Sequence, residues 1–312
     1  MSKIPVWFDA DTGVDDATAL LLANKLDEKL QIVGISCVAG NVPVEQVTEN
    51  TLRICDLMKK QYPVFKGAGK PWFKEYHDAC YFHGNNGIGD AVLPKESYEA
   101  GKEKAWDALH EAALRYEGQL EVIAVGPLTN IATAIVKYPD LNKLIKRVLI
   151  MGGAASGGNV TPAAEFNIYE DPHAAQTLFM SGIPVVMCGL EVTMQAYLTS
   201  EEIDEIHGHH SSVTDFYYAC TRISHRASQR LGLPGLCVHD ACPVLFAAYP
   251  ELFKGEEAGV YVETQSELTL GKTVTDLYSD FQFPEKNTFI VTDIDREKFA
   301  KVMIETLTSY RD

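Results

Sequence analysis

The chain has 312 residues, 46% of them hydrophobic, and carries a formal net charge of −16 at pH 7. This acidic balance excludes nucleic acids and anionic membranes as general partners, because both bind basic surfaces. No apolar run reaches the length of about 18 residues that crosses a bilayer, the first residues do not resemble a signal peptide, and the seven cysteines are scattered without metal-binding spacing. We therefore expect a soluble cytoplasmic protein with free thiols.

Short apolar runs typical of strands alternate with helix-like segments along most of the chain. The strand-like runs begin at residues 4, 32, 120, 147 and 184, and helix-like segments follow at 15–26, 44–60 and 131–138. Continuous apolar strands that end in Gly, Asn or Asp indicate a parallel sheet with helices on both faces. We predict a single α/β domain over 1–312 with an open, mostly parallel, Rossmann-like sheet. The pattern is looser near 69–104 and 199–238, which we interpret as insertions or lids.

Polar residues follow several of the predicted strands at the point where each strand ends. The acidic segment 11–16 follows the first run, Asn41 the second, Val125 a middle one, and the segment 151–167 the run that begins at Arg147. In an open α/β sheet, ligands bind beyond the carboxyl ends of the strands. If the strands are parallel, these segments lie at the same edge, and we predict the active site there.

Four carboxylates fall within an eight-residue stretch at the first strand–helix junction: Asp9, Asp11, Asp15 and Asp16. Carboxylates this close repel one another, and burial increases the repulsion. One of them could cap the helix, but capping does not explain Asp9 and Asp11. The spacing does not match an EF-hand loop, because Gly13 stands where an acidic ligand is needed. A hard cation with oxygen ligands is the simplest compensation.

A magnesium-dependent phosphatase of the haloacid-dehalogenase type is one alternative. Such enzymes carry D-x-D-x-[TV] after the first strand, so Asp9 would be the nucleophile and Asp11 the acid. Here Thr12 comes one position early and Gly13 occupies the Thr/Val position. This interpretation also leaves the later aspartates of the cluster without a role.

The pattern D-x-D-x-G-x-D-D at 9–16 resembles the signature of the inosine–uridine nucleoside hydrolases. Further segments match this family in order along essentially the whole chain. They are AGN at 39–41, HGNNGIGD at 83–90, VGPLTNIA at 125–132, MGGA at 151–154, GGNVTPAAEFNIYEDPHAA at 157–175, VHDACPV at 238–244, ELTLGKTVTD at 267–276 and TDID at 292–295.

The resemblance implies hydrolysis of the N-glycosidic bond of ribonucleosides to ribose and free base, with a calcium ion at the active site. The calcium ligands that it implies are Asp11, Asp16, the main-chain carbonyl of Val125, and Asp240. The substrate-binding positions that it implies are Asp15, Asn41, Met151, Asn159, Glu165 and Asn167, with Asp240 beside the substrate. It also implies a role in nucleoside salvage and a homo-oligomer, a dimer or tetramer.

The chemistry of glycosidic cleavage assigns roles to some of these residues. The transition state resembles an oxocarbenium ion, and a group of carboxylates is complementary to its positive charge. We expect Asp11 to act as general base toward a calcium-bound water and Asp15 to hold the ribose hydroxyls. His239 could protonate the leaving base, or could be a hydrogen-bonded histidine at a helix start. His83 could contact the substrate or order its own loop.

Base specificity is expected to depend on the segment 216–238. Its candidate residues are Phe216, Tyr217, Tyr218, Arg222, His225 and Arg230. The tyrosines could instead belong to a helix core, and the basic residues to a solvated helix face. We expect broad or pyrimidine-tolerant specificity.

Two further expectations concern ligands. No basic phosphate cradle accompanies the acidic pocket, so a phosphorylated substrate is not expected. The HGHH sequence at 207–210 invites a metal interpretation, but Gly208 interrupts it and we predict a solvated surface stretch. A non-catalytic calcium- or nucleoside-binding protein of the same fold stays open as an alternative.

Overall fold

A nine-stranded sheet runs through the computed structural model, which describes residues 3–277 and 285–312. The strand order is β10-β9-β11-β6-β5-β4-β1-β2-β3. Neighbours from β11 to β3 are parallel, and β9 pairs antiparallel with both β10 and β11. The predicted α/β fold with an open, mostly parallel sheet is confirmed.

The strands of this sheet are β1 (Ile4–Ala10), β2 (Leu30–Cys37), β3 (Val64–Lys66), β4 (Leu120–Ala124), β5 (Ile145–Met151), β6 (Val185–Cys188), β9 (Phe253–Val262), β10 (Thr273–Asp276) and β11 (Thr288–Ile294). A separate antiparallel pair joins β7 (Tyr197–Leu198) to β8 (Leu236–Cys237). The helices in the first half of the chain are α1 (Val14–Lys25), α2 (Val44–Leu57), α3 (Cys80–His83), α4 (Ala105–Arg115), α5 (Thr129–Lys137) and α6 (Leu141–Leu144). The later helices are α7 (Phe166–Glu170), α8 (Pro172–Phe179), α9 (Leu190–Thr193), α10 (Ser200–His207), α11 (Ser212–Arg230), α12 (Ala241–Ala248), the 3₁₀ turn η1 (Pro250–Leu252) and α13 (Arg296–Thr308).

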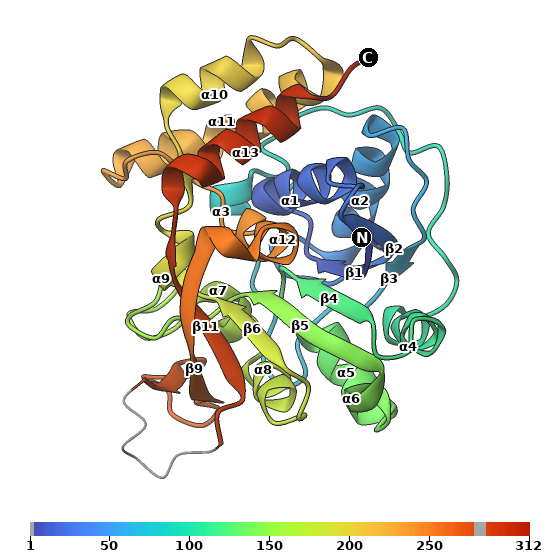
Figure 1. Ribbon diagram of the computed structural model, residues 1–312, viewed down its shortest axis with the longest axis vertical. Helices are drawn as coiled ribbons and strands as arrows, with labels where there is room; N and C mark the ends of the chain where they lie inside the picture. Colours follow the sequence, from blue (N-terminus) through green and yellow to red (C-terminus); the bar gives the residue numbers. More distant parts are fainter. Residues whose placement is uncertain (1–2, 278–284) are drawn as a thin grey trace.

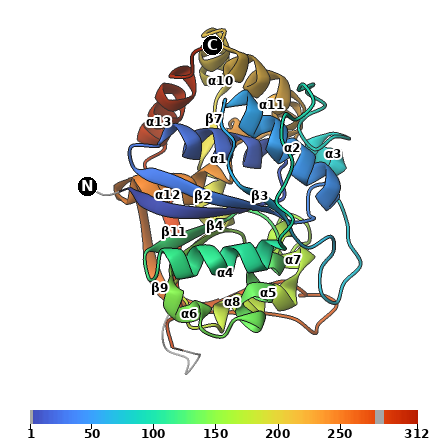
Figure 2. The same ribbon diagram turned by 90° about the vertical axis from the view of Figure 1, so that its right-hand side faces the viewer.

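Helices cover both faces of the sheet. Figures 1 and 2 show α1, α2 and α12 on one face and α4, α5 and α8 on the other. Two buried apolar clusters correspond to these layers. Since the central strands β1, β4 and β5 lie between two helical layers, nearly all of their residues are apolar and buried.

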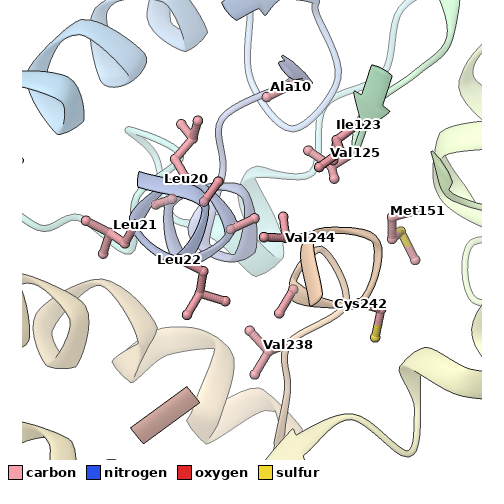
Figure 3. Packing of buried hydrophobic residues seen from close by; sticks show 14 of the residues in the cluster. Ala10, Leu20, Leu21, Leu22, Ile123, Val125, Met151, Val238, Cys242 and Val244 are labelled. Atoms are coloured by element: carbon pink, nitrogen blue, oxygen red, sulfur yellow. The ribbon is translucent and has the colours of Figure 1, made fainter. Parts of the chain in front are cut away.

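Helix α1 is buried on nearly all sides, as expected of a helix that is apolar around its whole circumference. Leu20, Leu21 and Leu22 are each 0% exposed. Figure 3 shows these leucines leaving α1 in different directions, with Val244 of α12 on the side of α1 opposite Leu21; Val125 and Met151 belong to the same buried cluster. The acidic residues at the start of α1 are therefore held by one of the most buried elements of the protein.

The two segments with a looser sequence pattern differ in structure. The segment 69–104 contains only the short helix α3 and an isolated bridge between Phe65 and Gly101. The segment 199–238 instead folds largely into α10 and the long helix α11. These helices carry polar caps, Thr199 and Ser211, that begin each of them.

All seven cysteines are free thiols. Among the residues that the structure describes, no helix combines the length and the apolar character that a membrane crossing requires. The cytoplasmic location stays a prediction.

Candidate functional site

The loops at the carboxyl ends of the parallel strands surround a pocket of about 320 Å³. Ten of the predicted site residues line it: Asp15, Asn41, His83, Val125, Met151, Asn159, Glu165, Asn167, His239 and Asp240. Seven of them lie at the ends of β1, β2, β4 and β5 or in the segments that follow, whereas His83 ends α3, and His239 and Asp240 follow β8. The predicted position of the site at the carboxyl edge of the sheet therefore agrees with the geometry.

Asp11 and Asp16 are 0% exposed and are not among the residues that line the pocket. Asn41 connects them: its backbone N–H donates to Asp11 Oδ2 at 2.8 Å, and its Nδ2 donates to Asp16 Oδ2 at 3.1 Å. Asp16 also accepts from the backbone N–H of Gly13 at 2.8 Å and of Asp11 at 3.2 Å. The Asp16 carboxylate thus stabilises the turn between β1 and α1 by accepting hydrogen bonds from the backbone of that turn.

Two glycines make room for the Asp11 carboxylate. A Cβ atom at Gly40 would overlap Asp11 Oδ2, and one at Gly126 would lie 2.8 Å from Asp11 Oδ1. Neither glycine is among those with positive φ. The space beside the carboxylate, and not an unusual backbone conformation, therefore requires glycine at both positions.

The carboxylates of the acidic cluster raise one another's pKa values. Burial, followed by the charge of Asp16, raises the pKa of Asp11 well above its usual range. Burial and then the charge of Asp15 raise the pKa of Asp240 in the same way, and raise that of Asp16 to about 7. A bound cation would favour the charged form of these carboxylates and so oppose both effects.

The same cluster fits a hard metal ion. One oxygen from each of Asp15, Asp16 and Asp240 lies within 4.8 Å of the others. Asp11 Oδ1 is buried and has no hydrogen-bond partner in the structure. An unpartnered buried carboxylate oxygen beside three converging carboxylates is the donor set expected for a cation with oxygen ligands.

Asn167 and Glu165 organise the wall of the pocket next to β4 and β5. Asn167 Nδ2 donates to the carbonyl oxygens of Val125 at 2.9 Å and Met151 at 3.1 Å. Glu165 caps α7 and accepts backbone N–H bonds from Gly153 and Asn167, both at 2.9 Å. Burial raises the pKa of Glu165 to about 7. Both side chains therefore line the pocket and also hydrogen-bond to the backbone at the ends of β4 and β5.

His83 has a structural contact in addition to its place in the pocket. Its Nδ1 accepts the backbone N–H of Val14 at 3.1 Å, and burial lowers its pKa to about 4. A neutral imidazole is required for this acceptor role. His83 therefore orders the start of α1 while its ring lines the pocket.

His239 lies beside Asp240 and is half-buried. Its Nδ1 pairs with Thr193 Oγ1 at 2.9 Å, which orients the ring at the pocket wall. Burial lowers the pKa of His239, and the charge of Asp15 acts in the opposite direction. Thr193 was not predicted from the sequence, although it ends the segment that follows β6 and the rule on strand ends could have identified it.

Asp9 does not take part in the pocket. It is 0% exposed, and its Oδ1 accepts from Asn130 Nδ2 at 2.8 Å and from the Ser36 hydroxyl. A carboxylate enclosed in this way cannot attack a substrate, which argues against the phosphatase interpretation.

The remaining pocket wall comes from residues that the sequence analysis did not single out. They are Ala79, Tyr81, Phe82, Val160, Phe166, Met194, Ser228, Leu231, Leu233 and Cys237. Only their positions in the chain could have identified them, because some of these residues adjoin His83 and others follow the end of α11.

The residues considered as candidates for contact with the base lie outside the pocket lining, and several of them take the alternative positions left open by the sequence. Phe216 and Tyr217 are buried in the core cluster, and Arg222 and Arg230 are exposed outside the pocket lining. His225 Nε2 pairs with the Ser200 hydroxyl at 3.2 Å. Tyr218 stacks on His207, with ring centroids 3.9 Å apart.

Residues 6–301 match the family model described as inosine-uridine preferring nucleoside hydrolase. The chain belongs to this family. It is 38% identical to the pyrimidine-specific ribonucleoside hydrolase RihA of Shewanella sp. (strain MR-7), over 98% of this chain and 96% of that protein.

Solved structures agree with the family assignment. The plant nucleoside hydrolase PpNRh1 matches with a TM-score of 0.93 and 27% identity, over 99% of this chain and 100% of that one. The purine-preferring ribonucleoside hydrolase from Gardnerella vaginalis matches with a TM-score of 0.92 and 32% identity, over 98% of each chain. The predicted activity, hydrolysis of the N-glycosidic bond of ribonucleosides, is confirmed at the level of the family, and the family assignment argues against the phosphatase alternative.

Proposed function

We propose that this nucleoside hydrolase works with calcium held by Asp11, Asp16, Asp240 and the main-chain carbonyl of Val125. The observation that carries the proposal is the unpartnered Asp11 Oδ1 beside the converging oxygens of Asp15, Asp16 and Asp240. Calcium takes six to eight oxygen ligands in proteins, so this set leaves positions for the substrate. When bound, the ion would supply positive charge to the carboxylates and would acidify a water molecule.

Asp11 is the proposed general base. A water proton passes to the Asp11 carboxylate, the water oxygen bonds to the anomeric carbon, and the bond from that carbon to the base nitrogen breaks with its electron pair leaving on the base. Asp15, Asn41, Glu165 and Asn167 line the pocket and are the proposed ribose-binding residues. The carboxylates of this set stabilise the positive charge that develops on the sugar ring.

His239 is the proposed source of the proton for the departing base. With Nδ1 held by Thr193, its Nε2 is the nitrogen available to the substrate. We expect His239→Ala to lower kcat for uridine and inosine by about 10²–10⁴-fold. A riboside of p-nitrophenol, whose leaving group needs no proton, should lose far less, because only leaving-group protonation is removed.

The control for this variant is His225→Ala, which replaces a half-buried histidine outside the pocket lining. Initial rates with both classes of substrate decide the outcome. An equal loss of kcat for the p-nitrophenyl riboside and for uridine would assign His239 a role other than protonation of the base.

The apolar part of the pocket is the proposed site of the base. Tyr81, Phe82, Leu231 and Leu233 line it, and Ser228 adds a hydroxyl group. Stacking and apolar contact accept any flat ring, whereas a defined set of hydrogen-bonding groups would select one base. We therefore propose that purine and pyrimidine ribonucleosides are both hydrolysed. The relatives support this breadth, since RihA is described as pyrimidine-specific and the Gardnerella enzyme as purine-preferring.

The cellular setting follows from the family resemblance alone. We propose that the enzyme acts in nucleoside salvage in the cytoplasm as a dimer or tetramer. Chromatography with light scattering on the purified protein measures the oligomeric state directly.

Release of reducing sugar from inosine, uridine, cytidine and adenosine tests the function. The purified protein is assayed as isolated, after chelation of metal, and after addition of calcium or magnesium. We expect ribose release that is lost on chelation and restored by calcium. Folded, calcium-loaded protein that releases no ribose from any of the four would overturn the proposed substrate class, and restoration by magnesium alone would overturn the choice of metal.

A further inference from the structure

The turn between α10 and α11 brings together two histidines and an aspartate outside the pocket. His207 is the last residue of α10, His210 lies in the turn, and Asp215 is in the first turn of α11. Asp215 Oδ1 lies 3.6 Å from His207 Nε2 and 3.8 Å from His210 Nδ1. One ligand atom from each of the three lies within 4.8 Å of the others.

These separations are close to those of a tetrahedral transition-metal site. With metal–ligand bonds of about 2.0–2.1 Å, neighbouring ligand atoms in a tetrahedron lie about 3.3–3.4 Å apart. The measured distances to Asp215 exceed this value by a few tenths of an ångström. Small side-chain rotations close such a gap, because His210 and Asp215 are exposed and free to adjust.

The ring of His207 is already oriented. It stacks on Tyr218 with centroids 3.9 Å apart and ring planes 8° apart. Tyr218 follows Asp215 by three residues, so both side chains lie on the same face of α11. One stacked imidazole thus fixes the direction from which a ligand nitrogen approaches, and less entropy is lost when a metal binds.

A second carboxylate lies near the group, and the third histidine of the turn has a different partner. Asp312 Oδ1 accepts the backbone N–H of Ser212 at 2.9 Å, which places this carboxylate at the start of α11. His209 pairs with Arg311. A histidine at the end of α10 and an aspartate at the start of α11 each interact favourably with the helix dipole. This effect explains the presence of His207 and Asp215, but it does not explain why their ligand atoms lie close to that of His210.

We propose that His207, His210 and Asp215 bind a divalent transition-metal ion such as Zn²⁺ at a site independent of the acidic pocket. Imidazole nitrogens with one carboxylate are typical zinc ligands, whereas the acidic cluster of Asp15, Asp16 and Asp240 converges through carboxylate oxygens. The ion ties the end of α10 to the start of α11. Figure 1 shows these helices with α13 at one end of the molecule, near the C-terminus. The prediction of a merely solvated HGHH stretch is revised by this proposal, because Asp215 across the turn supplies the third ligand.

Calorimetric titration of the calcium-saturated protein with Zn²⁺ tests the site. Wild-type protein is expected to bind one Zn²⁺ per chain, and Co²⁺ at the same site should give the absorption bands of tetrahedral coordination. His210→Ala and Asp215→Asn should each weaken Zn²⁺ binding at least tenfold and abolish the Co²⁺ bands. His209→Ala removes an adjacent exposed histidine that lies outside the cluster and should stay within twofold of wild type.

The thermal transition of each variant in calcium alone verifies folding, and addition of Zn²⁺ should raise it only in wild type and His209→Ala. Three results would overturn the proposal. They are absence of a bound Zn²⁺ in wild type, unchanged affinity in His210→Ala, which would place the ion at the acidic pocket, and equal weakening in His209→Ala.

Discussion

Asp11→Asn is expected to reduce kcat for every ribonucleoside substrate by about 10²–10⁴-fold, the usual contribution of a general base. The amide keeps one oxygen in place but cannot accept a proton from water. Asp11 is enclosed between Gly40 and Gly126, so an isosteric side chain fits and the fold should be preserved. Initial rates at saturating calcium and saturating nucleoside measure the effect.

The matched control is Asp27→Asn, at an exposed aspartate just beyond the end of α1, which should leave kcat within twofold of wild type. Circular dichroism and the thermal transition establish that both variants fold. Turnover by Asp11→Asn within threefold of wild type would contradict the base assignment. Full recovery at higher calcium would also contradict it, because it would limit Asp11 to metal binding.

Gly40→Ala is expected to lower kcat about 10²-fold although Gly40 carries no side chain and no chemistry. The added Cβ would overlap Asp11 Oδ2 and lie 2.8 Å from Pro127 Cδ. The ring of Pro127 is rigid, so the Asp11 carboxylate must move. A displacement of about 1 Å in a catalytic group costs roughly this factor. Steady-state kinetics and a calcium titration of the variant measure the loss.

Gly69→Ala is the control, because its Cβ would meet only the Val44 side chain at 3.4 Å, an ordinary contact distance. Both glycines lie in the loops beyond the parallel strands, and both replacements add one methyl group. Unchanged kcat in Gly40→Ala, with calcium affinity equal to that of wild type, would show that the Asp11 carboxylate does not depend on this space.

The sequence predicted the central parallel strands β1, β2, β4, β5 and β6 because each contains an apolar run. It did not predict β3, β9, β10 or β11. Strand β9 has the sequence FKGEEAGVYV, with exposed charged residues in its first half. It therefore lacks the apolar run from which a strand could be predicted. Its partners are antiparallel at the edge of the sheet, where one side faces solvent.

The predictions for the site succeeded where residues follow strand ends and failed where side-chain direction depends on helix packing. Asp15, Asn41 and Asn167 occupy the pocket as the rule on strand ends requires. The base wall could not be found in this way, since α11 directs Tyr217 into the core and presents Ser228 to the pocket. Only the packing of α11 against the rest of the protein decides which of its faces reaches the ligand.

The division of the pocket between two kinds of chain segment has a consequence for how this enzyme can change. The acidic half is built from strand ends and the start of the buried helix α1, where one added methyl group disturbs the carboxylates. The apolar half comes from two excursions outside the sheet, around Phe82 and Leu231. Apart from His83, which orders the start of α1, substitutions there leave the hydrogen bonds of the carboxylates unchanged, so the choice of base can vary separately from the catalytic chemistry. An engineer could redesign preference among nucleobases in those two excursions while leaving the bond-breaking machinery intact.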